Sequence, residues 1–305
     1  MNNVLKTKTN NPDSFRNQPL TTILVTGANG QLGHCIKDLE GQYPNLNFIY
    51  TDFTDLDICD LDQVMSFFAQ NKIDFCINCA AYTAVDQAEQ EQEQAFRINA
   101  KGPKNLAIVC SKNNTKLIQI STDFVFDGTK NTPYLETDEP NPVSVYGASK
   151  LQGEVEIQKL LKEHFIIRTS WLYSEHGHNF MKTMLRLAET KDEISVVSDQ
   201  LGTPTYAGDL AEVILTIIDS KSESYGIYHY SNEGVASWND FAKAIFELSN
   251  KNIRVNPIVA ANYPTAAKRP RYSVLDKEKI KQLLGIAIPK WQASLEVAFN
   301  IFFKK

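Results

Sequence analysis

The chain of 305 residues has a formal net charge of −5, and 22% of its residues are charged. An acidic chain of this kind has no general electrostatic attraction to nucleic acid or to anionic membrane surfaces. Apolar residues make up 43% of the chain. They never form a run of the roughly 18 residues that a membrane-spanning helix needs, so we expect no membrane partner.

A strand–helix alternation begins at Thr21, after a polar segment that lacks the apolar stretch of a secretory signal. We expect that segment, residues 1–20, to form an N-terminal extension. Short apolar runs predict buried strands at residues 23–26, 47–51, 75–79, 117–120 and 164–168. Amphipathic stretches predict helices at residues 32–39, 61–70, 94–113 and 149–162. The alternation predicts an α/β fold, with a doubly wound parallel sheet of Rossmann type covered by helices on both faces.

After Thr169 proline and glycine become more frequent, and the regular alternation is interrupted. Elements predicted there are helices at residues 179–189 and 237–250 and strands at residues 194–197 and 227–231. We therefore expect residues 21–175 to form a dinucleotide-binding domain and residues 176–305 to form mainly a smaller α/β substrate domain. Some elements of the second part are expected to return to the main sheet.

Three glycines, Gly27, Gly30 and Gly33, separate the first predicted strand from the first predicted helix. This strand–turn–helix context is the one that a dinucleotide-binding glycine motif requires. The first glycine permits a tight turn, the second lets the backbone approach a diphosphate, and the third allows close packing of helix on strand. The helix N-terminus offers N–H groups and a positive dipole end to phosphate oxygens. Ordinary turn glycines are the alternative interpretation.

Asp52 ends the next apolar run, about twenty residues beyond the glycines. A carboxylate at this position can accept hydrogen bonds from the ribose hydroxyls of an adenosine. It would repel a 2′-phosphate, which favours NADH over NADPH. A solvated aspartate at a strand end is the alternative, because Asp55 and Asp57 follow closely.

Two of the five cysteines, Cys76 and Cys79, have the spacing of a metal-binding or redox pair. No second cysteine pair or histidine pair has zinc-finger spacing, and the five histidines form no spaced metal set. Because the pair falls within a predicted buried strand, we expect structural thiols and no metal site. Such thiols suit a reducing, cytoplasmic location.

Tyr146 and Lys150 are four residues apart, a spacing that places both on one face of a helix. Ketone reduction needs a proton for the developing oxyanion, but a free tyrosine has a pKa of about 10. A nearby ammonium and an oxidised nicotinamide both favour the phenolate and lower that pKa. The hydroxyl of Thr122 or Ser121, at a strand end, can hold the carbonyl oxygen. For the tyrosine–lysine pair alone, an exposed helix face is the alternative.

The glycine motif occurs together with three further segments: Asn78-Cys-Ala-Ala-Tyr-Thr-Ala-Val-Asp86, Ser121-Thr-Asp-Phe-Val-Phe-Asp-Gly128 and Tyr146-Gly-Ala-Ser-Lys150. In this combination the chain resembles the extended short-chain dehydrogenase/reductases. Four later segments narrow the resemblance to the dTDP-4-dehydrorhamnose reductases: Arg168-Thr-Ser-Trp-Leu-Tyr173, Asn179-Phe-Met-Lys-Thr-Met-Leu, Asp199-Gln-Leu-Gly-Thr-Pro-Thr205 and Arg269-Pro-Arg-Tyr-Ser-Val-Leu275. The resemblance extends from about Thr21 to the C-terminus.

The resemblance implies a nicotinamide cofactor, NADPH or NADH, and roles for individual residues. The residues implied at the cofactor are Gly30, Gln31 and Leu32 at the diphosphate, Asp52 at the ribose, Asp60 and Leu61 at the adenine, and Ala81, Tyr82 and Thr83 at the nicotinamide half. The residues implied at the substrate are Thr122 and Asp123 beside Tyr146 and Lys150, together with Trp171, Asn179 and Arg269. For Trp171 a core position is the alternative, and for Arg269 a solvated loop.

The implied reaction transfers hydride from NAD(P)H to C4 of dTDP-4-dehydro-L-rhamnose, with Tyr146 as proton donor. The product, dTDP-L-rhamnose, would serve cell-surface polysaccharide synthesis, and a homodimer is a further expectation. One alternative is a reductase of another nucleotide-linked 4-ketosugar. Another is a non-catalytic subunit of the same fold, such as the regulatory subunit of methionine adenosyltransferase. The presence of Thr122, Tyr146 and Lys150 together argues against the latter, because a scaffold has no chemical need for all three.

Overall fold

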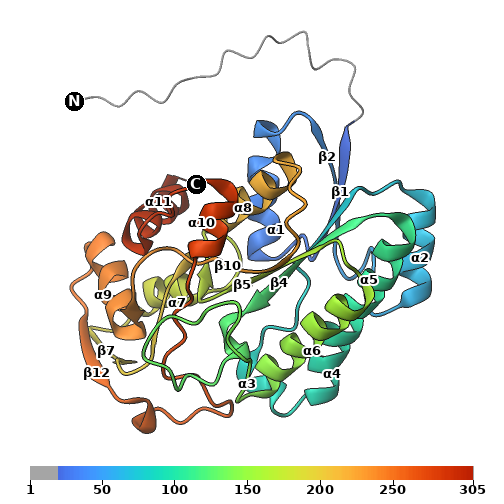
Figure 1. The fold of residues 1–305 in the computed structure, drawn as a ribbon. Coiled ribbons are helices and arrows are strands. Elements are labelled where there is room, and N and C mark those ends of the chain that lie inside the picture. Colours follow the sequence, from blue (N-terminus) through green and yellow to red (C-terminus); the bar gives the residue numbers. More distant parts are fainter. Residues whose placement is uncertain (1–19, 305) are drawn as a thin grey trace.

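The computed structural model describes residues 20–304, so the predicted N-terminal extension lies, apart from Leu20, outside the described residues. A six-stranded sheet of order β10-β5-β4-β3-β1-β2 forms its centre, and every neighbouring pair is parallel (Figure 1). The strands are β1 (Thr21–Thr26), β2 (Leu46–Thr51), β3 (Phe75–Asn78), β4 (Lys116–Thr122), β5 (His164–Thr169) and β10 (Gly226–His229). The predicted doubly wound parallel sheet is confirmed. Its strand order reverses between β1 and β3, and ligands of such sheets bind outside the carboxyl ends of the strands at this point.

Helices cover both faces of the sheet (Figure 1). On one face α2 (Leu61–Gln70), α5 (Gly102–Asn113) and α6 (Val145–Leu160) pack side by side. On the other face lie α1 (Gln31–Leu39) and α8 (Ala207–Asp219), with α10 (Glu278–Leu284) against β10. Strand β1 shows why: Ile23 and Val25 join the core beneath α1 and α8, whereas Leu24 joins the core beneath α2 and α5. Successive strand side chains point to opposite faces, so continuously apolar strands fill two cores.

The predicted helix over residues 94–113 consists of three pieces. They are α4 (Gln92–Phe96), a π-helical turn η3 (Arg97–Lys101) and α5. Short elements elsewhere in the first half are η2 (Glu40–Gln42), α3 (Val85–Ala88) and η4 (Asp123–Val125). A π-helical turn inside a helix is rare and often marks a functional site. Periodicity does not predict it, because the apolar pattern continues across the turn.

Helix α6 begins at Val145, four residues earlier than predicted. The hydroxyl of Ser144 caps it by accepting a hydrogen bond from the backbone N–H of Gly147 at 3.2 Å. A Cβ on Gly147 would lie 2.2 Å from the carbonyl oxygen of Phe124, so only glycine lets this helix rest directly on η4. The early start places Tyr146 and Lys150 in one helix, beside the end of β4.

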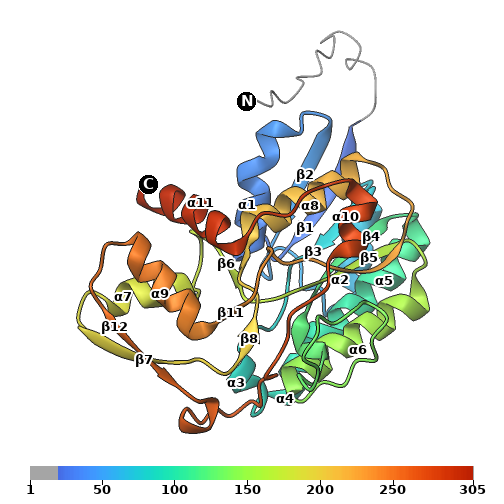
Figure 2. The ribbon, with the colours of Figure 1, turned by 60° about the vertical axis from the view of Figure 1, so that its left-hand side comes forward.

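Beside the carboxyl ends of the sheet lies a second layer of short strands and helices (Figure 2). It contains β6 (Leu172–Tyr173), α7 (Phe180–Leu187), β7 (Glu193–Val197), β8 (Leu201–Gly202), β9 (Thr205–Tyr206), β11 (Ala236–Ser237), α9 (Trp238–Leu248), β12 (Arg254–Ile258), η5 (Ala260–Asn262) and α11 (Trp291–Lys304). The layer has its own apolar core, which includes Met181, Phe241 and Leu295. Between its elements the chain returns to the main sheet through α8 and β10. Among residues 20–304, no helix combines the length and apolar character needed to cross a membrane.

Candidate active site

The glycine loop between β1 and α1 adopts the geometry that its sequence predicts. Gly27 has φ +63°, and a Cβ there would lie 2.6 Å from the backbone nitrogen of Ala80. A Cβ on Gly33 would lie 2.5 Å from the carbonyl oxygen of Ala28, so α1 packs directly on the loop. Gly30 is the N-cap residue of α1, where no side chain caps the helix and no acidic residue lies in the first turn. The N-terminal N–H groups therefore suit an anion such as a dinucleotide diphosphate.

A cavity of about 400 Å³ adjoins this loop, and Asp52 lines it. Asp52 follows the last residue of β2, and its carboxylate accepts hydrogen bonds from the backbone N–H groups of Asn29 (2.9 Å) and Phe53 (2.7 Å). The cavity is also lined by Asp57 and Arg97, which form an ion pair at 2.6 Å. Sequence reasoning assigned no role to Arg97, which is the first residue of the π-helical turn, an element that leaves no periodic signal in the sequence.

Asp60 and Leu61 do not line this cavity or the larger cleft. The Asp60 carboxylate instead caps α2 by accepting hydrogen bonds from the backbone N–H groups of Asp62 (3.0 Å) and Gln63 (3.1 Å). The cavity wall beside them is formed by Leu56 and Ile58. The adenine contacts assigned to Asp60 and Leu61 remain a prediction.

A larger cleft of about 620 Å³ lies outside the carboxyl ends of β4 and β5, and it brings Thr122, Tyr146 and Lys150 together. The Thr122 hydroxyl forms a hydrogen bond with the Tyr146 side chain. The Lys150 ammonium donates to the carbonyl oxygen of Ile120 at 2.6 Å. The Ser121 hydroxyl, the other candidate, donates to the Glu154 carboxylate. Thr122 is therefore the hydroxyl that meets the tyrosine.

The protonation states of this group suit a proton donor. Burial raises the pKa of Tyr146 to about 12, the hydrogen bond with Thr122 opposes this, and the charge of Asp123 adds to it. Burial lowers the pKa of Lys150 to about 8, whereas the charges of Glu154 and Cys79 act in the opposite direction. Near pH 7 the phenol keeps its proton and the ammonium keeps its charge. The expected lowering of the Tyr146 pKa by Lys150 is not part of this arrangement, because the ammonium is bound to a backbone carbonyl.

Asp123, assigned to the substrate, is buried in the same cleft. Its carboxylate accepts a hydrogen bond from the Thr122 hydroxyl at 3.1 Å. Burial raises the pKa of Asp123 to about 6, and hydrogen bonds from Ser273 and Thr122 oppose the shift. The cleft therefore holds a carboxyl group that titrates close to neutrality, next to the hydroxyl that meets Tyr146.

Behind the cleft lies a buried ion pair that sequence reasoning missed. Glu154, one turn after Lys150 on α6, has a fully buried side chain. Arg168 of β5 donates to both of its carboxylate oxygens, from Nε at 3.0 Å and from Nη2 at 2.7 Å. The two side chains hydrogen-bond to each other, and the Glu154 carboxylate places a negative charge close to Lys150. The spacing of Glu154 from Lys150 could have predicted a shared helix face, but not its burial.

The segment after β3 supplies the residues assigned to the nicotinamide half. Ala81 and Thr83 line the cleft. Tyr82 does not line it, and its hydroxyl donates to Glu91 at 2.9 Å. The side chain of Asn99, from the π-helical turn, accepts from the Tyr82 N–H at 2.8 Å and donates to the Tyr82 carbonyl at 3.0 Å. Asn99 thus fixes the backbone of this segment, a role that the sequence did not reveal.

Trp171 lines the cleft on the side of the second layer. Its backbone has φ +47°, a strained conformation for a residue with a side chain. Its ring stacks on Trp238 of α9, with ring centroids 3.6 Å apart. A Cβ on Gly202 would lie 2.6 Å from that ring, so glycine is needed there. Trp171 therefore borders the cleft, rather than occupying the core position that was its alternative.

Arg269 lines both the cleft and a neighbouring cavity of about 420 Å³ in the second layer. Trp238 also borders both spaces. The Arg269 guanidinium donates to both oxygens of Asp86, from Nη1 at 3.0 Å and Nη2 at 2.6 Å. This contact lowers the pKa of Asp86. A cationic fork therefore stands where the two spaces meet, rather than in a solvated loop.

Asn179 does not line the cleft. Its carbonyl oxygen caps α7, and its amide group donates to the Gln31 side chain at 2.9 Å and to the Ser174 carbonyl at 2.7 Å. It therefore ties the second layer to the glycine loop. Substrate contact by Asn179 remains a prediction. Gly177 and His178, which were not assigned, line the cleft beside it.

The cysteine pair singled out in the sequence does not share one environment. Cys76 is fully buried in the core beneath α5, where its thiol interacts with Cys110. Cys79 is half-buried and lines both cavities next to the glycine loop. Burial raises the pKa of Cys79 to about 12, which keeps it protonated. These environments suit inert thiols.

A glycine loop at the switch point and a threonine–tyrosine–lysine group in the adjoining cleft invite comparison with known proteins. The family described as the RmlD substrate binding domain matches residues 21–303. The chain belongs to this family. A dTDP-4-dehydrorhamnose reductase from Aggregatibacter actinomycetemcomitans is 43% identical over 288 residues, covering 91% of this chain and 98% of that protein.

Solved structures agree with this assignment. A dTDP-4-dehydrorhamnose reductase from Clostridium acetobutylicum is 45% identical and superposes with a TM-score of 0.88, covering 92% of this chain and 99% of that one. A dTDP-4-dehydrorhamnose reductase from Bacillus anthracis, in complex with NADP, is 40% identical with a TM-score of 0.89, again covering 92% and 99%. Family members and this chain therefore share one architecture over almost their whole lengths.

Proposed function

We propose that the protein is a dTDP-4-dehydrorhamnose reductase, which reduces the C4 ketone of dTDP-4-dehydro-L-rhamnose to give dTDP-L-rhamnose. The observation that carries the proposal is the convergence of Thr122, Tyr146 and Lys150 in one cleft next to the glycine loop. Relatives that bear this activity in their names match almost the whole chain. The product would enter the synthesis of a cell-surface polysaccharide.

NADPH or NADH is the cofactor of this reaction, and it supplies the hydride. Residues around the glycine loop could bind such a dinucleotide. The uncapped N-terminus of α1 and the close backbone approach at Gly27 provide for the diphosphate, and Asp52 lines the adjoining cavity where an adenosine would lie. The same cavity has a cation, Arg97, which can offset the repulsion between Asp52 and a 2′-phosphate. The relative from Bacillus anthracis is in complex with NADP, which supports use of the phosphorylated cofactor.

Tyr146 provides the proton. With a pKa of about 12 the phenol is protonated at neutral pH, and it can give its proton to the much more basic oxygen that develops as C4 is reduced. The Thr122 hydroxyl has one proton, which it donates to Asp123 here, and on substrate binding it can turn that hydrogen bond to the same oxygen and hold the carbonyl in place. We expect the charged Lys150 to stabilise the phenolate that remains once its ammonium turns from the Ile120 carbonyl toward it, before solvent returns the proton.

The second cavity is where we place the nucleotide of the substrate. It adjoins the cleft, and Trp238 and Arg269 border both spaces. The Arg269 guanidinium can bind the two phosphate groups that join sugar to nucleoside if they displace the Asp86 carboxylate from its Nη1 and Nη2 groups. The lining of aromatic and aliphatic side chains, among them Phe180 and Tyr263, suits the flat base. On this arrangement the sugar lies against Trp171 in the cleft.

The test is reduction of the ketosugar by purified protein. With dTDP-4-dehydro-L-rhamnose, NADPH or NADH is consumed, and the product is dTDP-L-rhamnose. The same 4-ketosugar on UDP separates recognition of the base from the chemistry, and we expect a lower kcat/KM for it. Absence of turnover with the dTDP-linked ketosugar and either cofactor would refute the proposal. Faster reduction of a different 4-ketosugar would assign the protein to a neighbouring reductase.

Two further predictions concern its setting. A cytoplasmic location is supported by the five cysteines, all of which are in the reduced, thiol form. A homodimer is supported by apolar side chains of α11 that face solvent, Val297 (49% exposed) and Phe303 (59% exposed). Light scattering on the purified protein tests the assembly, and we expect Val297→Asp to weaken it. A monomeric wild-type protein would refute the dimer.

A further inference from the structure

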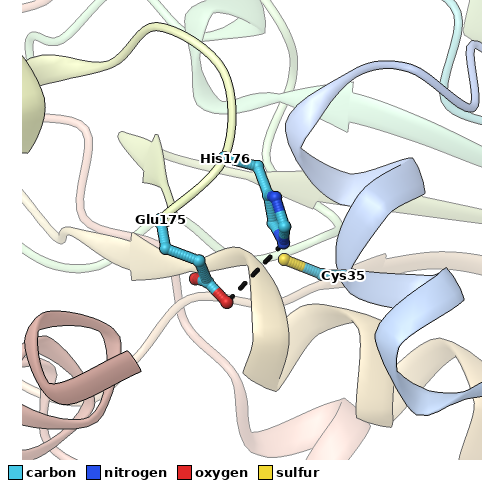
Figure 3. A group of neighbouring side chains, drawn as sticks. All are labelled: Cys35, Glu175 and His176. Carbon is cyan, nitrogen blue, oxygen red and sulfur yellow. Dashed lines mark ion pairs between the residues drawn. The ribbon is translucent and has the colours of Figure 1, made fainter. Parts of the chain in front are cut away.

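A second group of ionisable side chains consists of Cys35, Glu175 and His176 (Figure 3), and none of its members lines the reaction cleft. Cys35 comes from α1, whereas Glu175 and His176 come from the loop between β6 and α7. The Cys35 sulfur, a Glu175 carboxylate oxygen and a His176 ring nitrogen all lie within 4.8 Å of one another. Cys35 and Glu175 are buried, and the His176 side chain is 16% exposed. Residues about 140 positions apart thus bring three metal-binding donors to one point.

A fourth donor adjoins them. Asp38, one turn after Cys35 on α1, has a carboxylate oxygen 2.7 Å from Nε2 of His176. A Glu175 oxygen is 3.7 Å from the same nitrogen. That distance is beyond hydrogen-bond range, so the ring nitrogen contacts Asp38 directly and leaves a gap to the Glu175 carboxylate. A cation can bind the sulfur, the Glu175 carboxylate and the ring nitrogen, with Asp38 next to the ring nitrogen as the candidate fourth ligand.

The types of donor select the cation. Thiolate, imidazole and carboxylate are the ligands of Zn²⁺, which prefers four of them in a tetrahedron. Magnesium and calcium prefer oxygen ligands alone. Zinc–ligand bonds of about 2.0–2.3 Å place the donors of such a site roughly 3.5 Å apart. Cys35, Glu175 and His176 already lie within 4.8 Å of one another, and Asp38, whose side chain is half-exposed, has to turn toward the other two donors to complete the tetrahedron.

We propose that Cys35, Asp38, Glu175 and His176 form a zinc site that fastens the β6–α7 loop to α1. On binding, the Cys35 thiol releases its proton to solvent, and the thiolate forms the metal–sulfur bond. His176 binds through unprotonated Nε2, and the metal replaces its hydrogen bond with Asp38. The Tyr206 hydroxyl, 3.2 Å from a Glu175 carboxylate oxygen, remains to orient that ligand.

The site would be structural. Its loop continues to Gly177 and His178, which line the cleft, and its neighbour Asn179 donates to Gln31 at the start of α1. A metal that joins this loop to α1 therefore holds the cleft wall and the cofactor loop in a fixed relation. All four ligands lie apart from Thr122, Tyr146 and Lys150. The inference is independent of the proposed reaction, and its test needs no substrate.

The test uses full-length protein freed of metal with a chelator and of any affinity tag. Titration with Co²⁺ should produce a thiolate-to-cobalt charge-transfer band in the near ultraviolet and the visible bands of tetrahedral cobalt. Both should saturate at one ion per chain, and Zn²⁺ should displace them. Zinc should also raise the melting temperature. We expect Cys35→Ser to abolish the charge-transfer band and the melting shift. The matched control is Cys110→Ser, which changes a cysteine in a different core and should keep both.

Failure of wild-type protein to show the charge-transfer band, or persistence of that band in Cys35→Ser, would overturn the proposal. If Cys35→Ser does not fold by circular dichroism, Asp38→Asn and His176→Gln replace it, because both positions reach solvent. Each should weaken cobalt binding at least tenfold, which corresponds to loss of one ligand. Unchanged cobalt affinity in both variants would equally overturn the site.

Discussion

Removing the charge of Glu154 should destabilise the protein far more than removing a neighbouring charge on the same helix. Glu154 and Arg168 have side chains 0% and 2% exposed, and Glu154→Gln leaves the Arg168 guanidinium buried without a counter-charge. Breaking such a pair costs about 3–5 kcal/mol. Glu156, also on α6, pairs with Lys104 at 3.3 Å, but these side chains are 18% and 47% exposed. Glu156→Gln should therefore cost about 1 kcal/mol or less.

Urea unfolding of both variants measures the difference. A domain of ordinary stability, about 5–15 kcal/mol, still folds after either change at low temperature, so the free energies of unfolding can be compared. Replacing both partners, with Glu154→Gln and Arg168→Met, should restore part of the loss, because no guanidinium is then left buried without its partner. Equal costs for Glu154→Gln and Glu156→Gln would refute the reasoning, as would a double variant no more stable than Glu154→Gln alone.

Three further predictions follow from the structure. Because burial lowers the pKa of Lys150 to about 8, kcat/KM for the ketosugar should fall as pH rises through about 8; a profile flat to pH 10 would contradict this. In Gly202→Ala the new Cβ would lie 2.6 Å from the Trp171 ring, so the ring should be displaced and the KM for the nucleotide-sugar should rise about tenfold. An unchanged KM would contradict this prediction. His229 has a pKa lowered to about 3, mainly by burial, so its unfolded form binds a proton below about pH 6.5 and its native form does not. As pH falls from about 6.5 to about 3, the free energy of unfolding should decrease by up to about 1.4 kcal/mol per pH unit. His229→Gln should make this decrease smaller, as measured by urea unfolding at each pH.

Much of the fold follows from sequence pattern because inner strands of the sheet, such as β3 and β5, are buried on both faces. Each of the first five strands is a short apolar run bounded by turn residues, and helices such as α2 have simple amphipathic periods. The second layer was less predictable. Helix α8 was missed although Asp209, Glu212, Thr216 and Asp219 form a polar stripe along it, and α10, α11 and β12 were missed as well. The start of α6 was missed because it depends on the Ser144 cap, and not on apolar spacing.

The site was predictable where chemistry is local and unpredictable where it depends on packing. Glycine spacing and the Tyr146–Lys150 interval are short-range signals, and the structure brings both segments to the same cleft. The role of Asn99 depends on a π-helical turn, which leaves no periodic signature. Long-range groups such as Cys35 with His176 cannot be found from spacing, because only the fold makes them neighbours. Helix-capping residues such as Asp60 are of the same residue types as ligand-binding residues, so the sequence alone does not distinguish the two roles.

The most direct test of the proposed chemistry is single-turnover reduction of dTDP-4-dehydro-L-rhamnose by Tyr146→Phe. Loss of the proton donor should slow the chemical step by about 10²–10⁴-fold, while NADPH binding, followed by fluorescence, stays within a few-fold of wild type. Tyr225→Phe, which removes a hydroxyl before β10 at the opposite end of the sheet, should react at the wild-type rate. A Tyr146→Phe enzyme as fast as this control would contradict the account.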